Sequence, residues 1–272
     1  MKISFIGGGN MASALIAGLA GKLVVGADIH VVDPYADALA RLQAQFGVST
    51  AAAIDAALAA SDVIVLAVKP QQMRDVAAAL LPHLGRSQPL ILSIAAGIRG
   101  ADLARWLGGY AAIVRSMPNT PALIGLGITG MVAMDGVSAA QKAAADGIMK
   151  AVGATVWLDH EAQIDPVTAV SGSGPAYVFY FIEAMQQAAV EMGLSEAQGR
   201  ELALATFVGA AQLAAQSDDP VPLLREKVTS KGGTTYAALT SMEQAGVKDK
   251  IIAAMKAAAA RGRELGDELG AG

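Results

Sequence analysis

The first 160 residues alternate short apolar runs with longer alanine-rich segments in which apolar positions recur at helical spacing. The run at 63–68 is apolar throughout, as in a central parallel strand that is covered on both faces. The predicted strands are 2–6, 29–33, 63–68, 89–94, 111–116, 126–133 and 154–158. The predicted helices are 11–20, 36–46, 51–60, 71–81, 101–107 and 138–152. Because strands that alternate with helices are typical of a parallel sheet with right-handed crossovers, we expect an α/β, Rossmann-like domain over 1–160.

The pattern changes near residue 160, and from there on the apolar positions keep only a helical period. Long helices are predicted at 174–192, 195–216 and 247–269, and no run in this half is typical of a strand. We therefore expect 161–272 to form an all-helical C-terminal domain.

The predicted helix at 174–192 is apolar on nearly every side. Tyr177, Phe181 and Met185 form one stripe, whereas Phe179 and Tyr180 fall outside it. A helix that is apolar all round has to be covered by other parts of the protein. Burial inside the helical domain would satisfy this requirement, but we favour an interface with a second subunit.

The composition narrows the possible classes of protein. Hydrophobic residues make up 54% of the 272 residues, with alanine providing most of the excess, which is not typical of a disordered chain. No apolar run reaches the length of about 18 residues that a membrane-spanning helix needs. The 20 Lys and Arg residues are scattered and the net charge is −4, so a nucleic-acid partner, which requires clustered cations, is not expected.

Cysteine and histidine usage points away from metal chemistry. The chain has no cysteine, which excludes a disulfide framework or a zinc finger and fits a cytoplasmic location. The apolar stretch at the N-terminus is too short and too interrupted for a signal peptide. His30, His83 and His160 are assigned structural roles, and no bound metal is expected because Asp, Glu and His show no ligand spacing.

A glycine cluster lies between the first predicted strand and the first predicted helix. Residues 7–12, Gly-Gly-Gly-Asn-Met-Ala, fit the pattern G-x-G-x-x-A. In this pattern Gly7 permits a tight turn, Gly9 lets the backbone approach a pyrophosphate, and Ala12 lets the helix pack closely on the strand. The N-terminus of the helix adds unpaired N–H groups and a positive dipole. The motif predicts a bound dinucleotide.

Asp33 ends the second predicted strand, where an acidic residue would bind the hydroxyls of the adenosine ribose and disfavour a 2′-phosphate. No arginine is adjacent to it in the sequence, and Arg41 is about two helical turns further on. These residues favour NAD over NADP. The alternative is that Asp33 only begins a turn with Pro34.

Two glycine-rich stretches in the helical half, 171–176 and 228–235, each precede a predicted helix. Exposed N–H groups and hydroxyls at a helix N-terminus can bind a small carboxylate without any arginine. Helix capping by Ser and Thr would explain the same residues, and on the pattern alone capping is the simpler interpretation.

These motifs together resemble the pyrroline-5-carboxylate reductases, over the whole length of the chain. The shared stretches are 5–12, 67–70 (Ala-Val-Lys-Pro), 93–97, 117–121 (Met-Pro-Asn-Thr-Pro), 171–177 and 224–235. The last two are the specific ones, whereas the glycine turn is common to many dehydrogenases. Lys231 is a departure, because this position is often proline in such enzymes, and it leaves the stiffness of the loop open.

The resemblance implies hydride transfer from NADP(H) or NAD(H) to the C5=N bond of 1-pyrroline-5-carboxylate, giving L-proline. It also implies a helical dimerisation domain and a homodimer or a ring of dimers. The catalytic group would be the hydroxyl of Thr235 at the ring nitrogen, with N–H groups of the preceding loop on the carboxylate. The implied substrate-binding residues are Glu161, Ser230, Gly232, Gly233, Thr234 and Thr235. The cofactor-binding residues, with Asp33 from the pattern above, are Ile6, Gly7, Gly8, Gly9, Asn10, Met11, Asp33, Ala67, Val68, Lys69, Pro70, Ser93, Ala95 and Ala96.

Two other functions stay open on the sequence. A reductase of other imines or of β-hydroxyacids with the same two-domain plan usually carries a catalytic lysine or aspartate on the interdomain helix, and 171–176 contains neither. A non-catalytic NAD(P)-binding paralogue would not need the residues at 232–235, which are intact.

Overall fold

The computed structural model describes residues 1–84 and 88–271, so the last residue of the predicted helical domain, 272, lies outside it. The chain forms two compact units. The sheet unit contains Met1–Ser173 and the C-terminal segment that begins at Ala257, and the helical unit contains Gly174–Lys256. Within the described residues, none of the helices is both long enough and apolar enough to cross a membrane.

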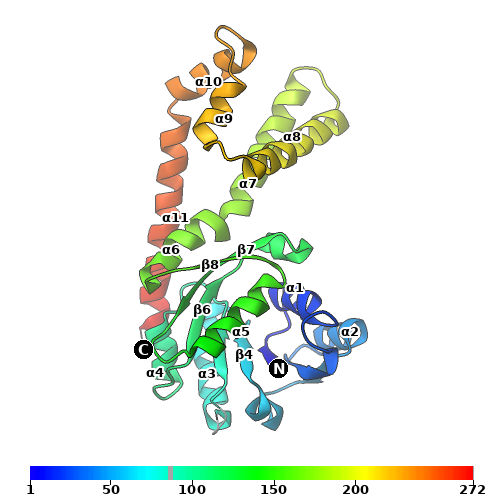
Figure 1. Ribbon diagram of the computed structural model, residues 1–272, viewed down its shortest axis with the longest axis vertical. Helices are drawn as coiled ribbons and strands as arrows, with labels where there is room; N and C mark the ends of the chain where they lie inside the picture. The colour runs from blue at the N-terminus through cyan, green and yellow to red at the C-terminus, as the bar shows by residue number, and fades with distance from the viewer. Residues whose placement is uncertain (85–87, 272) are drawn as a thin grey trace. The chain divides into compact units, whose positions relative to one another are not determined.

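The sheet unit is built on strands in the order β3-β2-β1-β4-β5-β6-β7-β8 (Figure 1). Neighbouring strands are parallel except for β6 and β7, which are antiparallel. The strands are β1 (Ile3–Ile6), β2 (Ile29–Val32), β3 (Ser49–Ala51), β4 (Val63–Leu66), β5 (Leu90–Ser93), β6 (Ile113–Met117), β7 (Gly127–Ala133) and β8 (Gly153–Trp157). The predicted Rossmann-like fold is therefore confirmed.

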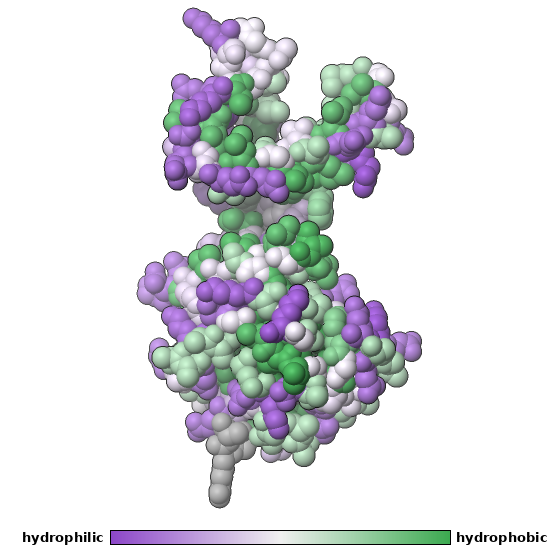
Figure 2. All heavy atoms as spheres, turned by 45° about the vertical axis from the view of Figure 1, so that its right-hand side comes forward, coloured by the Kyte–Doolittle hydropathy of each residue, from purple (hydrophilic) through white to green (hydrophobic). Residues whose placement is uncertain are grey.

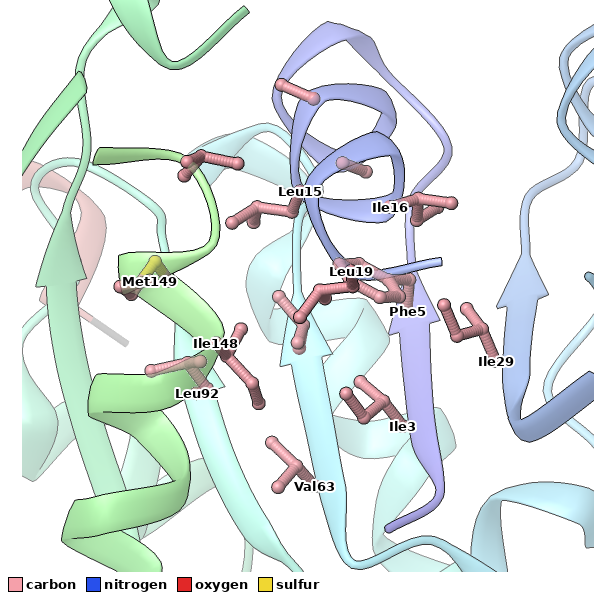
Figure 3. Packing of buried hydrophobic residues seen from close by; sticks show 14 of the residues in the cluster. Ile3, Phe5, Leu15, Ile16, Leu19, Ile29, Val63, Leu92, Ile148 and Met149 are labelled. Atoms are coloured by element: carbon pink, nitrogen blue, oxygen red, sulfur yellow. The ribbon is translucent and has the colours of Figure 1, made fainter. Parts of the chain in front are cut away.

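Helices cover both faces of this sheet. On one face α1 (Asn10–Leu19) and α5 (Ala139–Lys150) pack on Ile3, Phe5, Val63 and Leu92, as Figure 3 shows. On the other face α3 (Met73–Leu80) and α4 (Gly100–Trp106) pack on the remaining side chains of the same strands. Fully buried strands of this kind need cover on both faces, which explains their uninterrupted apolar runs. The helix α2 (Ala36–Phe46) has the predicted bounds and turns Leu39 and Leu42 into the core.

The prediction of a helix at 51–60 is wrong. Ser49–Ala51 instead forms the edge strand β3, paired with β2, and only Ala56–Ala60 forms a short 3₁₀ helix. The side chain of Asp55 accepts a hydrogen bond from the N–H of Ala57 and so begins that turn. Alanine-rich composition predicts a helix from propensity alone, but pairing with an exposed sheet edge outweighs so weak a preference.

The C-terminal segment packs on the sheet unit beside α4. The guanidinium of Arg99 donates to Asp267 at 2.5 Å, and that of Arg105 donates to the carbonyl of Gly270 at 2.8 Å. A Cβ atom on Gly97 would lie 3.2 Å from the Cβ of Leu265. The last turns of α11 (Val247–Gly270) thus support the connection between β5 and α4.

The helical unit consists of α7 (Gly174–Glu191), α8 (Glu196–Gln216), α9 (Val221–Lys227), α10 (Thr234–Gln244) and the first turns of α11. α7 and α8 approach closely where small residues meet, since a Cβ on Gly199 would lie 3.1 Å from that of Ala189. Ser195 and Gln198 form a capping box that begins α8. The sequence predicted the long helices of this unit, which follow from their period and caps.

We expect Gly97→Ala to destabilise the protein more than Gly21→Ala. Gly97 (φ +71°) and Gly21 (φ +73°) share a left-handed backbone, which costs an L-residue about 1–2 kcal/mol. A side chain at Gly97 would also press on Leu265, whereas one at Gly21 would meet nothing within 4 Å. Urea unfolding of both variants measures the difference. Equal losses would mean that the C-terminal segment does not pack on this turn in solution.

Candidate active site

The glycine turn lies at the carboxyl end of β1, where only glycine fits at the first position. Gly7 has φ +102°, and a Cβ there would lie 2.5 Å from the carbonyl oxygen of Ala67. The N–H of Gly7 donates to the carbonyl of Val32 at 2.8 Å, which joins the turn to the end of β2. A Cβ on Gly9 would meet nothing within 4 Å, so the backbone is open to a ligand at that point.

The first turn of α1 leaves its N–H groups available. Gly9 is the N-cap, and within the described residues no side chain caps it. The first hydrogen bond of the helix runs from Ser13 to Gly9, so the N–H groups of Asn10, Met11 and Ala12 have no acceptor in the helix. Together with the glycine turn, these donors form a site suited to a phosphate.

A cavity of about 750 Å³ lies beside this turn, and it is bounded by the ends of β1, β2 and β4 and by α2. The predicted cofactor residues that line it are Ile6, Gly7, Gly8, Gly9, Asp33, Ala67, Val68 and Lys69. Asn10, Met11, Pro70, Ser93, Ala95 and Ala96 do not line this cavity. They nevertheless lie close to the same sheet edge, because Ile6, Leu66 and Ser93 end neighbouring strands side by side.

Asp33 is nine-tenths buried, and both of its carboxylate oxygens accept backbone hydrogen bonds. Oδ2 accepts from the N–H of Gly8 at 2.7 Å, and Oδ1 accepts from the N–H of Tyr35 at 2.8 Å. The side chain therefore connects the glycine turn to the β2–α2 loop while it also borders the cavity. Each oxygen retains a second lone pair, so the structural role and a contact with a ribose are compatible.

The turn after β5 is held by hydrogen bonds of its own. The buried Ser93 hydroxyl accepts from the N–H of Ala95 at 3.4 Å, and the Ser116 hydroxyl donates to the carbonyl of Ser93 at 3.0 Å. Ala95 is buried and Ala96 is half-buried. Because this turn begins where β5 ends, it shares the sheet edge with the glycine turn.

The carboxylate of Glu161 binds two donors within the sheet unit. Its Oε1 accepts from the backbone N–H of Gly100 at 2.5 Å and from the guanidinium of Arg115 at 2.6 Å. Arg115 lies in β6 and is 95% buried, and the carboxylate of Glu161 is the partner that compensates its buried charge. Arg115 was not among the predicted site residues, and its only local signal was a cation inside an apolar strand.

The glycine-rich stretch at 171–176 does not form the open helix N-terminus that the sequence predicted. It continues a helical path from α6 (Ile164–Val167) through one π-helical turn (Thr168–Gly172) into α7. The N–H of Ser173 therefore donates to the carbonyl of Thr168 at 2.8 Å. The buried side chain of Asn119, from the shared stretch 117–121, donates to the carbonyl of Ser171 at 3.2 Å, a contact that the sequence did not predict. This stretch is an internal helical irregularity, and its N–H groups are not an anion site.

The loop at 230–235 forms a tight turn followed by an uncapped helix. The N–H of Gly233 donates to the carbonyl of Ser230 at 3.0 Å, and Gly232 has φ +76°, which together define a type II turn with Lys231 at its second position. Gly233 is the N-cap of α10, and no side chain of the described residues caps that helix. The capping interpretation of Thr235 is therefore wrong, and its hydroxyl is available to a ligand.

His30 lies apart from these features, whereas His160 directly precedes Glu161 and is the N-cap of the short 3₁₀ helix Glu161–Gln163. His30, near the start of β2, has Nδ1 at 2.9 Å from the Ser49 hydroxyl and Nε2 at 3.3 Å from the carboxylate of Asp55. These groups lie at the amino-terminal edge of the sheet. Among the described residues there is no group of three His, Asp or Glu side chains that could hold a metal ion.

A mostly parallel sheet with an open glycine turn at its carboxyl edge, followed in the chain by a helical unit, defines the class of dinucleotide-binding proteins. The sequence model of the pyrroline-5-carboxylate reductase dimerisation domain matches residues 161–265. A second model, described as NADP oxidoreductase, coenzyme F420-dependent, matches residues 2–97. The chain is 46% identical to a pyrroline-5-carboxylate reductase of Pseudomonas aeruginosa over 99% of its own length and 98% of that relative. It belongs to the pyrroline-5-carboxylate reductase family.

Solved structures give the same result. A pyrroline-5-carboxylate reductase from Coxiella burnetii is 39% identical and superposes with a TM-score of 0.91 over 97% of this chain and 98% of the other. A pyrroline carboxylate reductase from Plasmodium falciparum, solved with NADP bound, is 31% identical with a TM-score of 0.87 over 98% of both chains.

We expect Lys231→Pro to stabilise the protein by about 0.4–1 kcal/mol, because proline suits the second position of a type II turn and restricts the unfolded chain. No hydrogen bond donated by the N–H of Lys231 is found within the described residues, so proline removes none. Chemical denaturation at one protein concentration measures the change. Lys231→Ala removes the charge without restricting the backbone, and this control should stay close to the original protein. A destabilised proline variant would contradict the type II turn.

Proposed function

We propose that this protein is a pyrroline-5-carboxylate reductase that transfers a hydride from NAD(P)H to the C5=N bond of 1-pyrroline-5-carboxylate and forms L-proline, the last step of proline biosynthesis. The uncapped helix start at Thr234, directly after the tight turn at Ser230, carries the proposal. The identity to the Pseudomonas aeruginosa relative, which extends over both units, supports it.

Hydride transfer to the imine needs little acid–base catalysis from the protein. A protonated cyclic imine already accepts a hydride readily, and the bound nicotinamide supplies that hydride. The protein therefore has to orient the imine carbon and exclude water, and it needs no histidine as a base. This fits a substrate loop made of glycine, serine and threonine.

The substrate carboxylate is proposed to bind at the start of α10. Gly233 was expected to offer its N–H to the carboxylate, but that group already donates to Ser230. Gly233 therefore serves the site by closing the turn, and of the three N–H groups expected on the carboxylate, those of Gly232 and Thr234 remain available. The first-turn N–H groups of α10 have no acceptor in the helix, and the helix dipole adds a positive potential for an anion.

Glu161 is proposed to position the substrate side of the site through Arg115 and Gly100. Its carboxylate holds the start of α4 against β6 at the beginning of the segment that leads into α7. We also propose that the two predicted domains have separate roles. Residues 1–160 bind the dinucleotide, and residues 161–272 supply the substrate and dimer contacts. The two matched family regions, residues 2–97 and 161–265, fall on either side of that boundary.

Turnover of the cyclic imine by the purified protein, followed by the absorbance of the reduced nicotinamide, tests the proposed activity. Reduction of 1-pyrroline-5-carboxylate with either cofactor is the expected result. Turnover of only other imines or of β-hydroxyacids, or binding of the dinucleotide without turnover, would contradict it.

We expect Thr235→Ala to reduce turnover by about 10²–10³, the usual effect of losing one positioned hydrogen bond to the transition state. The proposed bond joins the Thr235 hydroxyl to the ring nitrogen and holds C5 in line with the nicotinamide. Thr235→Ser retains the hydroxyl and should keep much of the activity. Steady-state kinetics, dinucleotide affinity and the melting temperature should be measured on the same samples. Normal turnover with a lower melting temperature would show a structural role only.

We propose that both cofactors are used, in a ratio that depends on Asp33. The Plasmodium falciparum structure, with NADP bound, supports NADP as one of them. Asp33→Ser should raise the kcat/KM for NADPH relative to that for NADH, because it removes a negative charge next to the ribose. The ratio is informative because disturbing the hydrogen bonds to Gly8 and Tyr35 would affect both cofactors alike. An unchanged ratio would leave Asp33 with its role in the turn alone.

We also propose a homodimer, or a ring of dimers, joined through the helical unit. The apolar side chains of α7 support this, since Phe179 is 64% exposed and Tyr180 is 71% exposed in a single chain. Hydrophobic residues, green in Figure 2, lie on the surface of this unit. Exposed apolar surface of this kind is typical of an interface. Light scattering should give at least twice the mass of 27.5 kDa, and a fully active monomer would contradict the proposal.

We propose a cytoplasmic location as well, which the cysteine-free chain supports.

A further inference from the structure

An arginine lines the cavity beside the glycine turn, although its distance from Asp33 in the sequence had not suggested a place in the cofactor site. Arg41 of α2 borders this cavity together with Gly8, Asp33, Tyr35 and Asp37. It was expected to lie too far from Asp33 to affect the cofactor, because the two are eight positions apart in the sequence. The fold brings both side chains to one cavity.

The packing of α2 explains this placement. Leu42 is fully buried, and its Cδ1 would lie 3.3 Å from a Cβ on Gly8, so α2 is held directly against the glycine turn. Arg41 precedes Leu42 and is exposed, which puts it at the edge of the buried face of the helix. Arg41 therefore borders the cavity while the neighbouring leucine anchors the helix.

This guanidinium has no partner among the described residues. Asp37 lies one turn earlier on α2, the spacing of a helical ion pair, yet no ion pair between the two is formed. The carboxylate of Asp33 is taken by the backbone N–H groups of Gly8 and Tyr35. An unpaired arginine at a ligand cavity is free to bind an anion on the ligand.

We propose that Arg41 binds the 2′-phosphate of NADPH. The inference rests on the proposed dinucleotide site, in which the residue that ends β2 lies beside the 2′ position of the adenosine ribose. A phosphate there faces the carboxylate of Asp33, and a guanidinium in the same cavity offsets that repulsion. Arginine suits this task because its planar donors match phosphate oxygens and its charge does not depend on pH. Arg41 thus allows NADPH to bind in spite of Asp33.

Binding of NADP⁺ and NAD⁺ to the full-length protein tests this, because the two molecules differ only in the 2′-phosphate. Isothermal titration calorimetry should show that Arg41→Ala raises the Kd of NADP⁺ about 10- to 100-fold, as expected for lost charge-assisted hydrogen bonds. The Kd of NAD⁺ should change less than about twofold, well under one hydrogen bond. Arg74→Ala is the matched control, because Arg74 is an exposed arginine of α3 that does not border the cavity.

Equal weakening of both nucleotides by Arg41→Ala would overturn the proposal, and so would an unchanged Kd for NADP⁺. A similar loss in Arg74→Ala would also overturn it, because it would indicate a general effect of positive charge. Absence of binding by either nucleotide to the unaltered protein would refute the dinucleotide site itself. These titrations contain no imine, so their result is separate from that of the turnover assay, in which the proposed activity can fail while nucleotide binding persists.

Discussion

The close approach of Gly7 to the carbonyl of Ala67 is the constraint on which the rest of the site depends. It requires a residue without a side chain, and it lets the ends of β1 and β4 lie side by side at one sheet edge. From that contact follow the open backbone at Gly9, the free N–H groups at the start of α1 and the cavity bounded by α2. A Cβ at position 7 would displace all of these together.

Backbone groups, rather than charged side chains, provide most of the proposed ligand contacts. The two acids that were predicted to lie near a ligand accept hydrogen bonds from the protein itself. The carboxylate of Asp33 accepts from the N–H groups of Gly8 and Tyr35. The carboxylate of Glu161 accepts from the N–H of Gly100 and from the buried Arg115. Thr235 is different, because it is the second residue of a helix whose N-cap is a glycine, and its hydroxyl is not used in capping. This contrast separates residues that shape the site from the one proposed to act on the substrate.

Where the predictions erred, the deciding contact lay outside the few residues on which the prediction rested. The alanines after residue 50 favour a helix by propensity, yet the first of them, Ala51, pairs with the edge of β2 as part of β3. Ser171 and Ser173 look like capping residues, yet the preceding segment is itself helical, so α7 continues that segment and has no open N-terminus. Neither the free edge nor the preceding π-helical turn can be recognised from nearby residues.

Local patterns were sufficient for the strands β1, β2, β4 and β5, for the glycine turn and for the long helices, because burial on two faces and helical period leave their mark in consecutive residues. The loop at 230–235 was recognised from its residue types, but its type II turn and its uncapped helix start required the backbone itself. Pairings between distant segments were decided only by the tertiary structure: Arg115 with Glu161, α2 with the glycine turn, and the C-terminal turns of α11 with the turn at Gly97. Such pairings depend on how strands are ordered in the sheet and on which faces the helices cover, and no short stretch of sequence carries that information.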